Sequence, residues 1–167
     1  MPTDGGGGDL AARRNLLVPQ NLYRCILQHC REEVPLEACG VMTGVGEQVC
    51  AAYPMTNVRR SPVAYRIKEE EQLAAFHEMD ERREELVAIY HSHPTTAARP
   101  SATDISMAYY PEALYIIVSL AEAQPVLNAY RIVDGNVAQV AVTITDDAGD
   151  WRDVRESGGW RRSARNM

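Results

Sequence analysis

The sequence has no long apolar run, since nothing in its 167 residues approaches the ~20 successive apolar residues that a membrane span needs. Its start, MPTDGGGGDLAARRN, carries charges but no apolar segment of the kind that a secretory signal contains. From these two absences we expect a cytoplasmic protein without a membrane contact.

Cysteine and histidine signatures of structural zinc sites are also missing. The four cysteines are Cys25, Cys30, Cys39 and Cys50, and their spacings include no C-x-x-C pair. In the cytoplasm they are predicted to be free thiols in or near the core. The helical H-E-x-x-H signature is absent, because HEMDE lacks the second histidine.

Positive charge is scarce, with 17 Lys and Arg against 23 Asp and Glu and a net charge of -6. Proteins that bind nucleic acid broadly neutralise its phosphates with basic patches, so binding of this kind is not expected. A local patch can differ in charge from the whole chain, which leaves a small protein partner as an option.

The chain does contain an alternation of helix and strand signals, which predicts an α/β fold with one mixed β-sheet flanked by helices. Four consecutive glycines indicate that residues 1–14 are disordered. Residues 15–145 are predicted to form one folded domain. Residues 146–167 are predicted to be a C-terminal extension that either packs loosely or stays mobile.

Two helices are indicated by apolar residues at three- and four-residue steps. The first starts at Pro19, which suits the first position of a helix, and buries His29 as a packed structural side chain. The second lies in KEEEQLAAFHEMDERREE and presents Leu73, Phe76 and Met79 as its apolar stripe.

Strands and turns account for most of the remaining chain. ACGVMTGV and QVCAAYPMTN are predicted to form a hairpin, and a second hairpin is predicted around the strong turn signal Asp134-Gly135. ELVAIYHSH and ALYIIVSL are predicted to be buried strands, with a short helix in PSATDISMAYY between them.

The strand ELVAIYHSH ends in two histidines, His91 and His93. At positions i and i+2 of a strand, both side chains point to the same side of the sheet. Asp104 lies in the first turn of the next helix, from which it can return as a third ligand. Two nitrogens and one oxygen would leave a fourth tetrahedral position for water, as in catalytic zinc sites.

The same residues also have a structural interpretation. Ser101 and Asp104 form an S-x-x-D pattern, which is typical of a capping box at the start of a helix. Two histidines near a strand end can simply hydrogen-bond to their neighbours, so H-x-H alone does not decide between the interpretations.

The whole string, H-S-H followed by seven residues and then S-x-x-D, resembles the motif of the JAMM (MPN+) metalloproteases. Upstream, PLEACGVMTG is similar to the P-x-E-x-C-G segment of that family, and the resemblance covers most of residues 16–145. It implies a cytidine-deaminase-like JAMM/MPN catalytic domain over residues 15–145. A deaminase activity is not implied, because the H-x-E and P-C-x-x-C elements are missing.

The resemblance also implies a role for each residue of the motif. His91, His93 and Asp104 would hold Zn²⁺. Glu37 would hold the water on the zinc, acting first as general base and then as acid toward the leaving amine. Ser101 would donate a hydrogen bond to the oxyanion. Ser92, between the histidines, points to the opposite face and is expected to be structural.

A further segment, MTNVRRSPVAYR at residues 55–66, resembles M-T-N-x-x-R-S-P-x-x-Y-R in the bacterial branch that acts on sulfur carriers. It implies cleavage after the C-terminal Gly-Gly of a ubiquitin-like (ThiS-like) sulfur carrier protein, with release of cysteine or trimming of tail residues. We expect this segment to line the groove for the tail. Its Arg59, Arg60 and Arg66 would bind the carboxylate of the released residue or acidic groups of the carrier. The alternative is an exposed loop with solvated arginines.

Two other functions stay open at this level. A non-catalytic MPN-type scaffold would only bind partners, although such scaffolds lack metal ligands that this chain keeps. A general zinc peptidase would cleave unrelated peptides as fast as the carrier adduct. The sequence also leaves open the carrier, its pathway and the oligomeric state, including a homodimer.

Overall fold

The computed structural model describes residues 14–155 and 161–162. The predicted disorder of residues 1–14 falls almost wholly outside this part, as do residues 156–160 and 163–167 of the C-terminal extension. Within the described residues, no helix is both long and apolar enough to cross a membrane.

The described elements alternate between strands and helices in the predicted way. In chain order they are β1 (Asn15–Pro19), α1 (Gln20–Glu33), β2 (Cys39–Val45), β3 (Gln48–Met55), α2 (Glu69–Glu81), β4 (Glu85–His93), α3 (Ala102–Ser106), β5 (Leu114–Ser119), β6 (Val126–Val133), β7 (Asn136–Thr145), β8 (Asp150–Asp153) and β9 (Arg161–Arg162). Pro19 is the N-cap of α1. The helix therefore begins at Gln20, one residue later than predicted.

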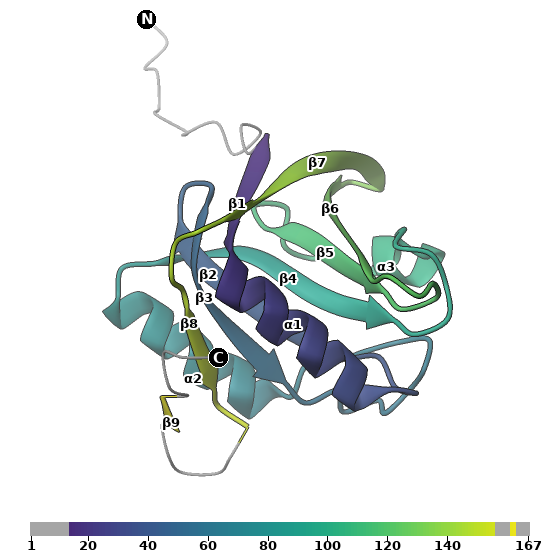
Figure 1. The fold of residues 1–167 in the computed structure, drawn as a ribbon, viewed down its shortest axis with the longest axis horizontal. Coiled ribbons are helices and arrows are strands. Elements are labelled where there is room, and N and C mark those ends of the chain that lie inside the picture. The colour runs from purple at the N-terminus through teal and green to yellow at the C-terminus, as the bar shows by residue number, and fades with distance from the viewer. Residues whose placement is uncertain (1–13, 156–160, 163–167) are drawn as a thin grey trace, which may run out of the picture.

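The strands form one sheet in the order β1-β7-β6-β5-β4-β2-β3-β8-β9 (Figure 1). At its centre β4 runs parallel to β5, whereas β2 is antiparallel to both β3 and β4. The sheet is therefore mixed, as the sequence predicts, and β4 lies in the middle of it. The carboxyl end of β4, where His91 and His93 lie, faces α3 (Figure 1).

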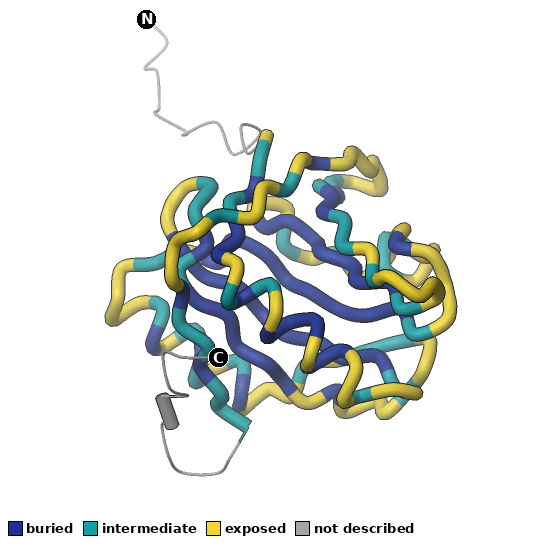
Figure 2. Tube along the Cα trace, in the orientation of Figure 1, coloured by how far each residue is buried: buried dark blue, intermediate teal, exposed yellow. Residues whose placement is uncertain are grey.

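Helices cover both faces of the sheet, which separates two apolar cores. α1 contributes Leu22 and Ile26 to the core on one face. α2 contributes Ala75 to the core on the other face, with Phe76 packed against it. The central strands are buried between these layers, as Figure 2 shows. This arrangement confirms the predicted sheet flanked by helices.

Gly40 in β2 occupies a position where only glycine fits. A Cβ there would clash with the ring of Tyr90 and with the carbonyl oxygen of Tyr53.

The Tyr90 hydroxyl lies 2.8 Å from Nδ1 of His29, which is buried. His29 is therefore a packed structural histidine, as predicted.

Both predicted hairpins form. At the turn between β6 and β7, Asp134 and Gly135 have φ angles of 51° and 78°. A type I′ turn needs left-handed values at both central residues, and its twist matches that of the flanking strands. The Asp134-Gly135 signal therefore predicts this turn correctly.

The apolar stripe predicted for α2 is wrong at Leu73, which is 68% exposed. The residues that the helix buries are Glu71, Ala75 and Glu78. The two carboxylates tolerate burial because they have polar partners. Glu71 accepts hydrogen bonds from the backbone N–H and the hydroxyl of Thr56 (2.6 and 2.7 Å), and Glu78 pairs with the arginine that ends the helix.

Part of the C-terminal extension adds a strand to the sheet, because β8 pairs in parallel with β3. Its Arg152 is 4% exposed. The guanidinium donates to the Tyr53 hydroxyl (2.6 Å), to Asp150 (3.0 Å) and to Glu84 (3.3 Å). Of the two alternatives left open by the sequence, packing therefore applies to the β8 part of the extension.

The cysteines are free thiols, as predicted. Cys25, Cys30 and Cys39 are buried, and Cys50 is half-buried. Burial raises the pKa of the Cys30 and Cys39 thiols, so neither is a reactive thiolate near neutral pH.

Candidate metal centre

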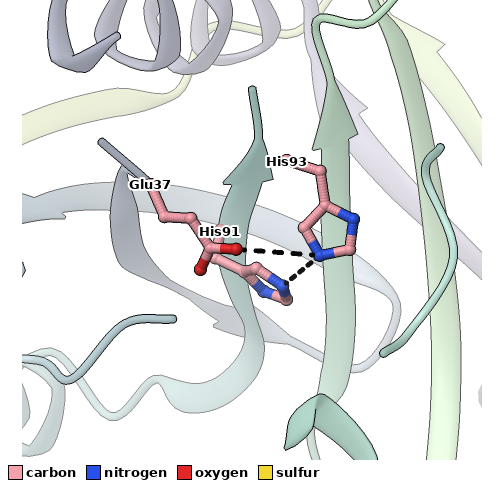
Figure 3. A group of neighbouring side chains, drawn as sticks. All are labelled: Glu37, His91 and His93. Carbon is pink, nitrogen blue, oxygen red and sulfur yellow. Dashed lines mark hydrogen bonds and ion pairs between the residues drawn. The ribbon is translucent and has the colours of Figure 1, made fainter. Parts of the chain in front are cut away.

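β4 delivers two imidazoles to one side of the sheet, because His91 and His93 are two residues apart on a strand. Between them Ser92 points the other way, and its Oγ accepts a hydrogen bond from the N–H of Ala38 (2.8 Å). The N–H of Ser92 donates in turn to the carbonyl oxygen of Ala38 (3.0 Å). These two bonds tie Ala38 to β4 and so bring the neighbouring Glu37 to the histidines (Figure 3).

Three donor atoms converge at this point. His91 Nε2 lies 3.1 Å from His93 Nε2, and Asp104 Oδ2 lies 3.2 Å from the former and 3.1 Å from the latter. Glu37 also offers an oxygen within 4.8 Å of both histidines, but its Oε1 is 3.9 Å from His93 Nε2. Asp104 is therefore the closer candidate for a third ligand, and Glu37 lies farther from the histidines.

The triangle of donors fits one tetrahedral ion such as zinc. Zinc holds nitrogen and oxygen ligands at about 2.0–2.1 Å, which places two tetrahedral ligands about 3.3 Å apart. The three separations of 3.1, 3.1 and 3.2 Å are close to this value. The donor set of two imidazoles and one carboxylate is also one that zinc takes at catalytic sites.

The outer nitrogens of the two histidines have different surroundings. His93 Nδ1 lies 2.8 Å from the carbonyl oxygen of Ala97 and donates to it, which leaves the Nε2 lone pair for a metal. His91 Nδ1 is buried and has no hydrogen-bond partner in the part of the chain that the structure describes. The His91 ring instead stacks on Tyr65, with ring centroids 4.6 Å apart and planes at 22°.

The loop PTTAARP returns the chain from β4 to α3 and is fixed from the neighbouring strands. The carbonyl oxygen of Thr96 accepts from the hydroxyl of Ser119 (2.6 Å), and that of Ala98 accepts from the hydroxyl of Tyr130 (2.5 Å). The carbonyl that orients His93 lies between these two anchors, so the position of His93 depends on the loop.

Ser101 and Asp104 form the capping box that the structural interpretation predicts. The N–H of Asp104 donates to Ser101 Oγ (3.0 Å), and the N–H of Ser101 donates to Asp104 Oδ2 (2.9 Å). This oxygen is also the one that faces both histidines. The capping box therefore also orients Asp104 Oδ2 toward the two histidines. Ser101 Oγ serves as an acceptor in it and keeps its hydroxyl proton for another bond.

Burial and neighbouring groups shift the pKa values at this centre in different directions. For His93, burial lowers the pKa, but hydrogen bonds with Asp104 and the carbonyl of Ala97 outweigh it and raise the pKa above its ordinary value. Burial lowers the pKa of His91 and keeps its ring neutral. Burial raises the pKa of Asp104, but hydrogen bonds with His91 and His93 outweigh it and hold the pKa well below its ordinary value. Burial raises the pKa of Glu37 to about 7, against the opposing effect of His93. The site thus holds one firm carboxylate and one that can exchange a proton near neutral pH.

A groove of about 820 Å³ opens beside the centre. Its lining includes Asp104 at the metal site, the aromatic rings of Tyr65 and Tyr109, and the exposed side chains of Arg59 and Arg66. Leu73 also lines it, which explains why α2 leaves this side chain exposed. Arg60 is exposed and is not one of the lining residues.

The structure brings together all five residues that the sequence singles out for chemistry: Glu37, Ser101, His91, His93 and Asp104. It also reveals two contacts that sequence reasoning missed, namely Tyr65 against His91 and Asn57 against the backbone of Glu37 (3.0 Å). Both residues belong to the segment that resembles the bacterial branch. The resemblance of that segment was a signal that could have pointed to these two residues, but a role was predicted only for its arginines.

Comparison with known proteins gives a consistent family. The family model described as prokaryotic homologs of the JAB domain matches residues 19–133. A CysO-cysteine peptidase of Mycobacterium tuberculosis is 39% identical over 134 residues, which cover 78% of this chain and 92% of the relative. A desampylase of Haloferax volcanii is 39% identical over 101 residues, which cover 56% of this chain and 73% of the relative.

A solved structure is similar in fold. The solution structure of a Desulfitobacterium hafniense protein superposes with a TM-score of 0.72 at 32% identity, covering 79% of this chain and 94% of that one. The matched parts include the strands and helices that carry the metal centre described above, since the family match spans β2, β4 and α3.

Proposed function

Because this chain belongs to the family of prokaryotic homologs of the JAB domain, we propose that it is a zinc-dependent hydrolase that cleaves the amide bond after the C-terminal Gly-Gly of a ubiquitin-like sulfur carrier. A hydrolase acting on conjugates of this class agrees with the peptidase and desampylase among its relatives. One observation carries the zinc part of the proposal: the mutual separations of 3.1–3.2 Å between His91 Nε2, His93 Nε2 and Asp104 Oδ2.

Zinc held by these three atoms would act as a Lewis acid that polarises the scissile carbonyl and makes water acidic enough to react near pH 7. The chain's own residues then divide the remaining work among themselves. Asp104 supplies the ligand that stays anionic, and Ala97 keeps His93 in the tautomer whose Nε2 is free.

Glu37 is the general base and then the general acid. It is 2% exposed, and its Oε2 has no hydrogen-bond partner among the described residues. In this role the carboxylate takes a proton from the attacking water as the new C–O bond forms. It then gives the proton to the amide nitrogen as the C–N bond breaks. A pKa raised by burial to about 7 suits both steps.

Ser101 stabilises the charge that grows on the carbonyl oxygen. Its Oγ accepts the hydrogen bond from Asp104 N–H, so the hydroxyl proton stays available to a substrate oxygen. A donor placed for the tetrahedral state acts mainly in the transition state, where the oxygen becomes negative.

The groove is the proposed site for the substrate tail. Glycine lacks a Cβ, so a Gly-Gly tail can approach a metal centre that bulkier residues cannot reach. Arg59 and Arg66 are exposed in the groove lining, where they would bind the carboxylate of the released residue or acidic groups of the carrier. We propose release of cysteine, or trimming of tail residues, as the reaction at this site.

The function is tested with a purified carrier that ends in Gly-Gly-Cys. We expect the wild-type protein loaded with one zinc per chain to release cysteine, detected by mass spectrometry, and Glu37→Gln to bind zinc without cleaving. A matched carrier ending in Ala-Ala-Cys should be cut far more slowly. Cleavage by Glu37→Gln at the wild-type rate would indicate that the proposed base is wrong.

The same assay separates the alternatives. A scaffold would bind the carrier and release nothing, even with zinc present. A general peptidase would cut unrelated peptides at rates that match the carrier adduct. For the arginines, Arg59→Ala and Arg66→Ala should raise KM with kcat unchanged, whereas Arg60→Ala, outside the groove lining, serves as the control. Unchanged KM in both variants would contradict their role.

A further inference from the structure

The segment between β3 and α2 closes on itself around the side chain of Asn57. A backbone bridge joins Asn57 to Ile67 at its two ends. The buried amide of Asn57 accepts from the N–H groups of Arg59 (3.1 Å) and Arg66 (3.0 Å) through Oδ1. Through Nδ2 it donates to the carbonyl oxygen of Ala64 (3.0 Å). The segment is therefore organised by one side chain from its interior.

The second donor bond of Asn57 leaves the segment and reaches Glu37. Nδ2 donates to the carbonyl oxygen of Glu37 at 3.0 Å, and the N–H of Glu37 donates to the carbonyl oxygen of Ser61 at 2.9 Å. Both backbone polar groups of the proposed base are thus bonded to this one segment. All four hydrogen-bonding positions of the Asn57 amide are in use, so a side chain without a carboxamide cannot satisfy the same set of partners.

The same segment also contacts a metal ligand. Tyr65 follows Ala64 directly and stacks on the ring of His91, with centroids 4.6 Å apart and planes at 22°. His93 has a carbonyl partner that orients its ring, but His91 Nδ1 has no hydrogen-bond partner among the described residues. Stacking on Tyr65 takes the place of the outer hydrogen bond that commonly orients a ligating histidine.

We propose that residues 57–67 are a positioning element of the metal centre, in which Asn57 orients Glu37 and Tyr65 orients His91. The proposal assigns a role to the residues of MTNVRRSPVAYR other than its arginines. It rests on the proposed function only in taking Glu37 as the base and His91 as a zinc ligand.

The contact of Tyr65 is tested by zinc affinity, measured by competition with a chromophoric chelator. Tyr65→Phe keeps an aromatic ring over His91, whereas Tyr65→Leu keeps apolar volume without a stacking face. We expect the leucine variant to bind zinc at least about tenfold more weakly and the phenylalanine variant to stay within about twofold, since outer contacts of a ligand are worth about 10–100-fold.

Val63→Ala is the matched control, because Val63 lies in the same segment and is 72% exposed. Thermal unfolding checks that each variant is folded, and Tyr65→Met replaces the leucine variant if that one does not fold. Cobalt substitution adds a spectrum that reports on ligand geometry, which should change in Tyr65→Leu and not in Tyr65→Phe. Equal losses in the phenylalanine and leucine variants, or no loss in either, would overturn the role of the ring.

The contact of Asn57 is tested by hydrogen exchange of the Glu37 amide in the zinc-free protein. Asn57→Asp keeps an acceptor for Arg59 and Arg66 but places a carboxylate oxygen against the carbonyl of Glu37. We expect exchange at Glu37 to accelerate about tenfold, the cost of one buried hydrogen bond, while amides of β5 are unchanged. Exchange at Glu37 that matches wild type would overturn the role of Asn57.

Activity supplies the second readout for Asn57. If Asn57 acts through Glu37, Asn57→Asp lowers kcat in the wild-type background and has no further effect in a Glu37→Gln background. Equal losses in both backgrounds would contradict this. Wild-type protein that binds no zinc would overturn the proposed function itself, whereas normal zinc binding with unaffected variants would overturn only the positioning element.

Discussion

Two buried clusters of charged side chains in this protein differ in how their charges are balanced. Around Arg152, the guanidinium meets the carboxylates of Glu78, Glu84 and Asp150 at 3.0–3.5 Å. At the candidate metal centre, the ion-pair partners of Glu37 and Asp104 among the described residues are imidazoles, and Asp104 also accepts from the N–H of Ser101. The first cluster contains its own cation and holds β8 on the sheet, whereas the second is proposed to bind a metal ion.

The difference shows how a site can be distinguished from a structural network. Buried carboxylates are costly unless a positive group or several donors compensate them. Arg152 supplies that compensation for the buried Glu78 and Glu84, also pairs with the half-exposed Asp150, and holds β8 on the sheet. The metal centre leaves Glu37 Oε2 and His91 Nδ1 without partners in the described structure. Glu78 Oε2 of the Arg152 cluster also lacks a partner among the described residues, so the candidate metal centre is distinguished by the convergence of His91 Nε2, His93 Nε2 and Asp104 Oδ2.

The largest expected effect comes from neutralising Glu37, a carboxylate without a cationic partner of the kind that Arg152 provides. Glu37→Gln should lower kcat about 10²–10⁴-fold, the usual contribution of a general acid–base group. Its free energy of unfolding and its zinc affinity should stay near wild type, because Glu37 makes no ion pair except with His93 at 3.9 Å in the described structure. Rate assays on the carrier adduct, zinc titration and urea unfolding measure the three quantities. A large loss of unfolding free energy in Glu37→Gln would contradict the distinction between the two clusters.

Removing the Arg152 guanidinium from the other cluster should lower the free energy of unfolding without affecting catalysis. Arg152→Ala leaves Glu84 without the guanidinium and Glu78 with Arg82 alone, and breaking a buried pair of this kind costs about 3–5 kcal/mol. Urea unfolding measures this loss. Arg152→Met, which keeps apolar volume, is the matched control for lost packing. In either variant the folded fraction should bind zinc like wild type, and weakened binding would show that the two clusters are coupled.

Glu84→Gln makes in the structural cluster the same chemical change that Glu37→Gln makes in the site. Glu84 accepts from the hydroxyl of Thr43 (3.0 Å) and from Arg152 (3.3 Å), so its charge is used in a pair. We expect a loss of about 1–3 kcal/mol in unfolding free energy, the range for a hydrogen bond to a charged group. kcat should equal that of wild type. A lower kcat in this variant would argue against the contrast.

His29 supplies a third buried polar group, one that stays neutral and needs no counter-ion. Burial and the nearby Arg155 lower its pKa from 6.5 to about 3. The unfolded chain takes up the proton below pH 6.5 while the folded chain does not, so stability falls as pH drops from 6.5 toward 3. Between pH 7 and 5 this loss is at most about 2 kcal/mol.

Urea unfolding of wild type and His29→Gln at pH 7 and pH 5 isolates this contribution. The glutamine side chain can still bond to the Tyr90 hydroxyl that His29 faces. The pH-dependent part of the stability should therefore be smaller in the variant. The same slope in both proteins would show that folding does not lower the pKa of His29.

Most elements of the fold, and the residues that converge at the candidate metal centre, could be predicted because their signals are local. The two histidines and Ser92 follow the alternation of one strand, and the turn at Asp134-Gly135 is set by two residues. The site also depends on Glu37, more than fifty residues upstream of the histidines, which only the resemblance to a family connected to them. Local periodicity and one family motif together account for what lies along single elements.

The remainder depends on partners that are distant in sequence. Leu73 looks like core, yet α2 buries Glu71 instead because Thr56 supplies two donors. Arg152 looks like a residue of a charged tail, yet it reaches Tyr53 in β3, which no pattern within DWRD indicates. Asn57 acts through its position beside Glu37 in space. None of these contacts is visible in composition or periodicity.

The central claim is that His91, His93 and Asp104 hold one zinc ion, and calorimetric zinc titration tests it most directly. We predict one zinc per chain in wild type and in Asp150→Ala, an aspartate variant from the Arg152 cluster. Asp104→Ala should bind more weakly by more than the ~10–100-fold that loss of an outer contact costs. Absence of zinc binding in wild type, or wild-type affinity in Asp104→Ala, would contradict the account.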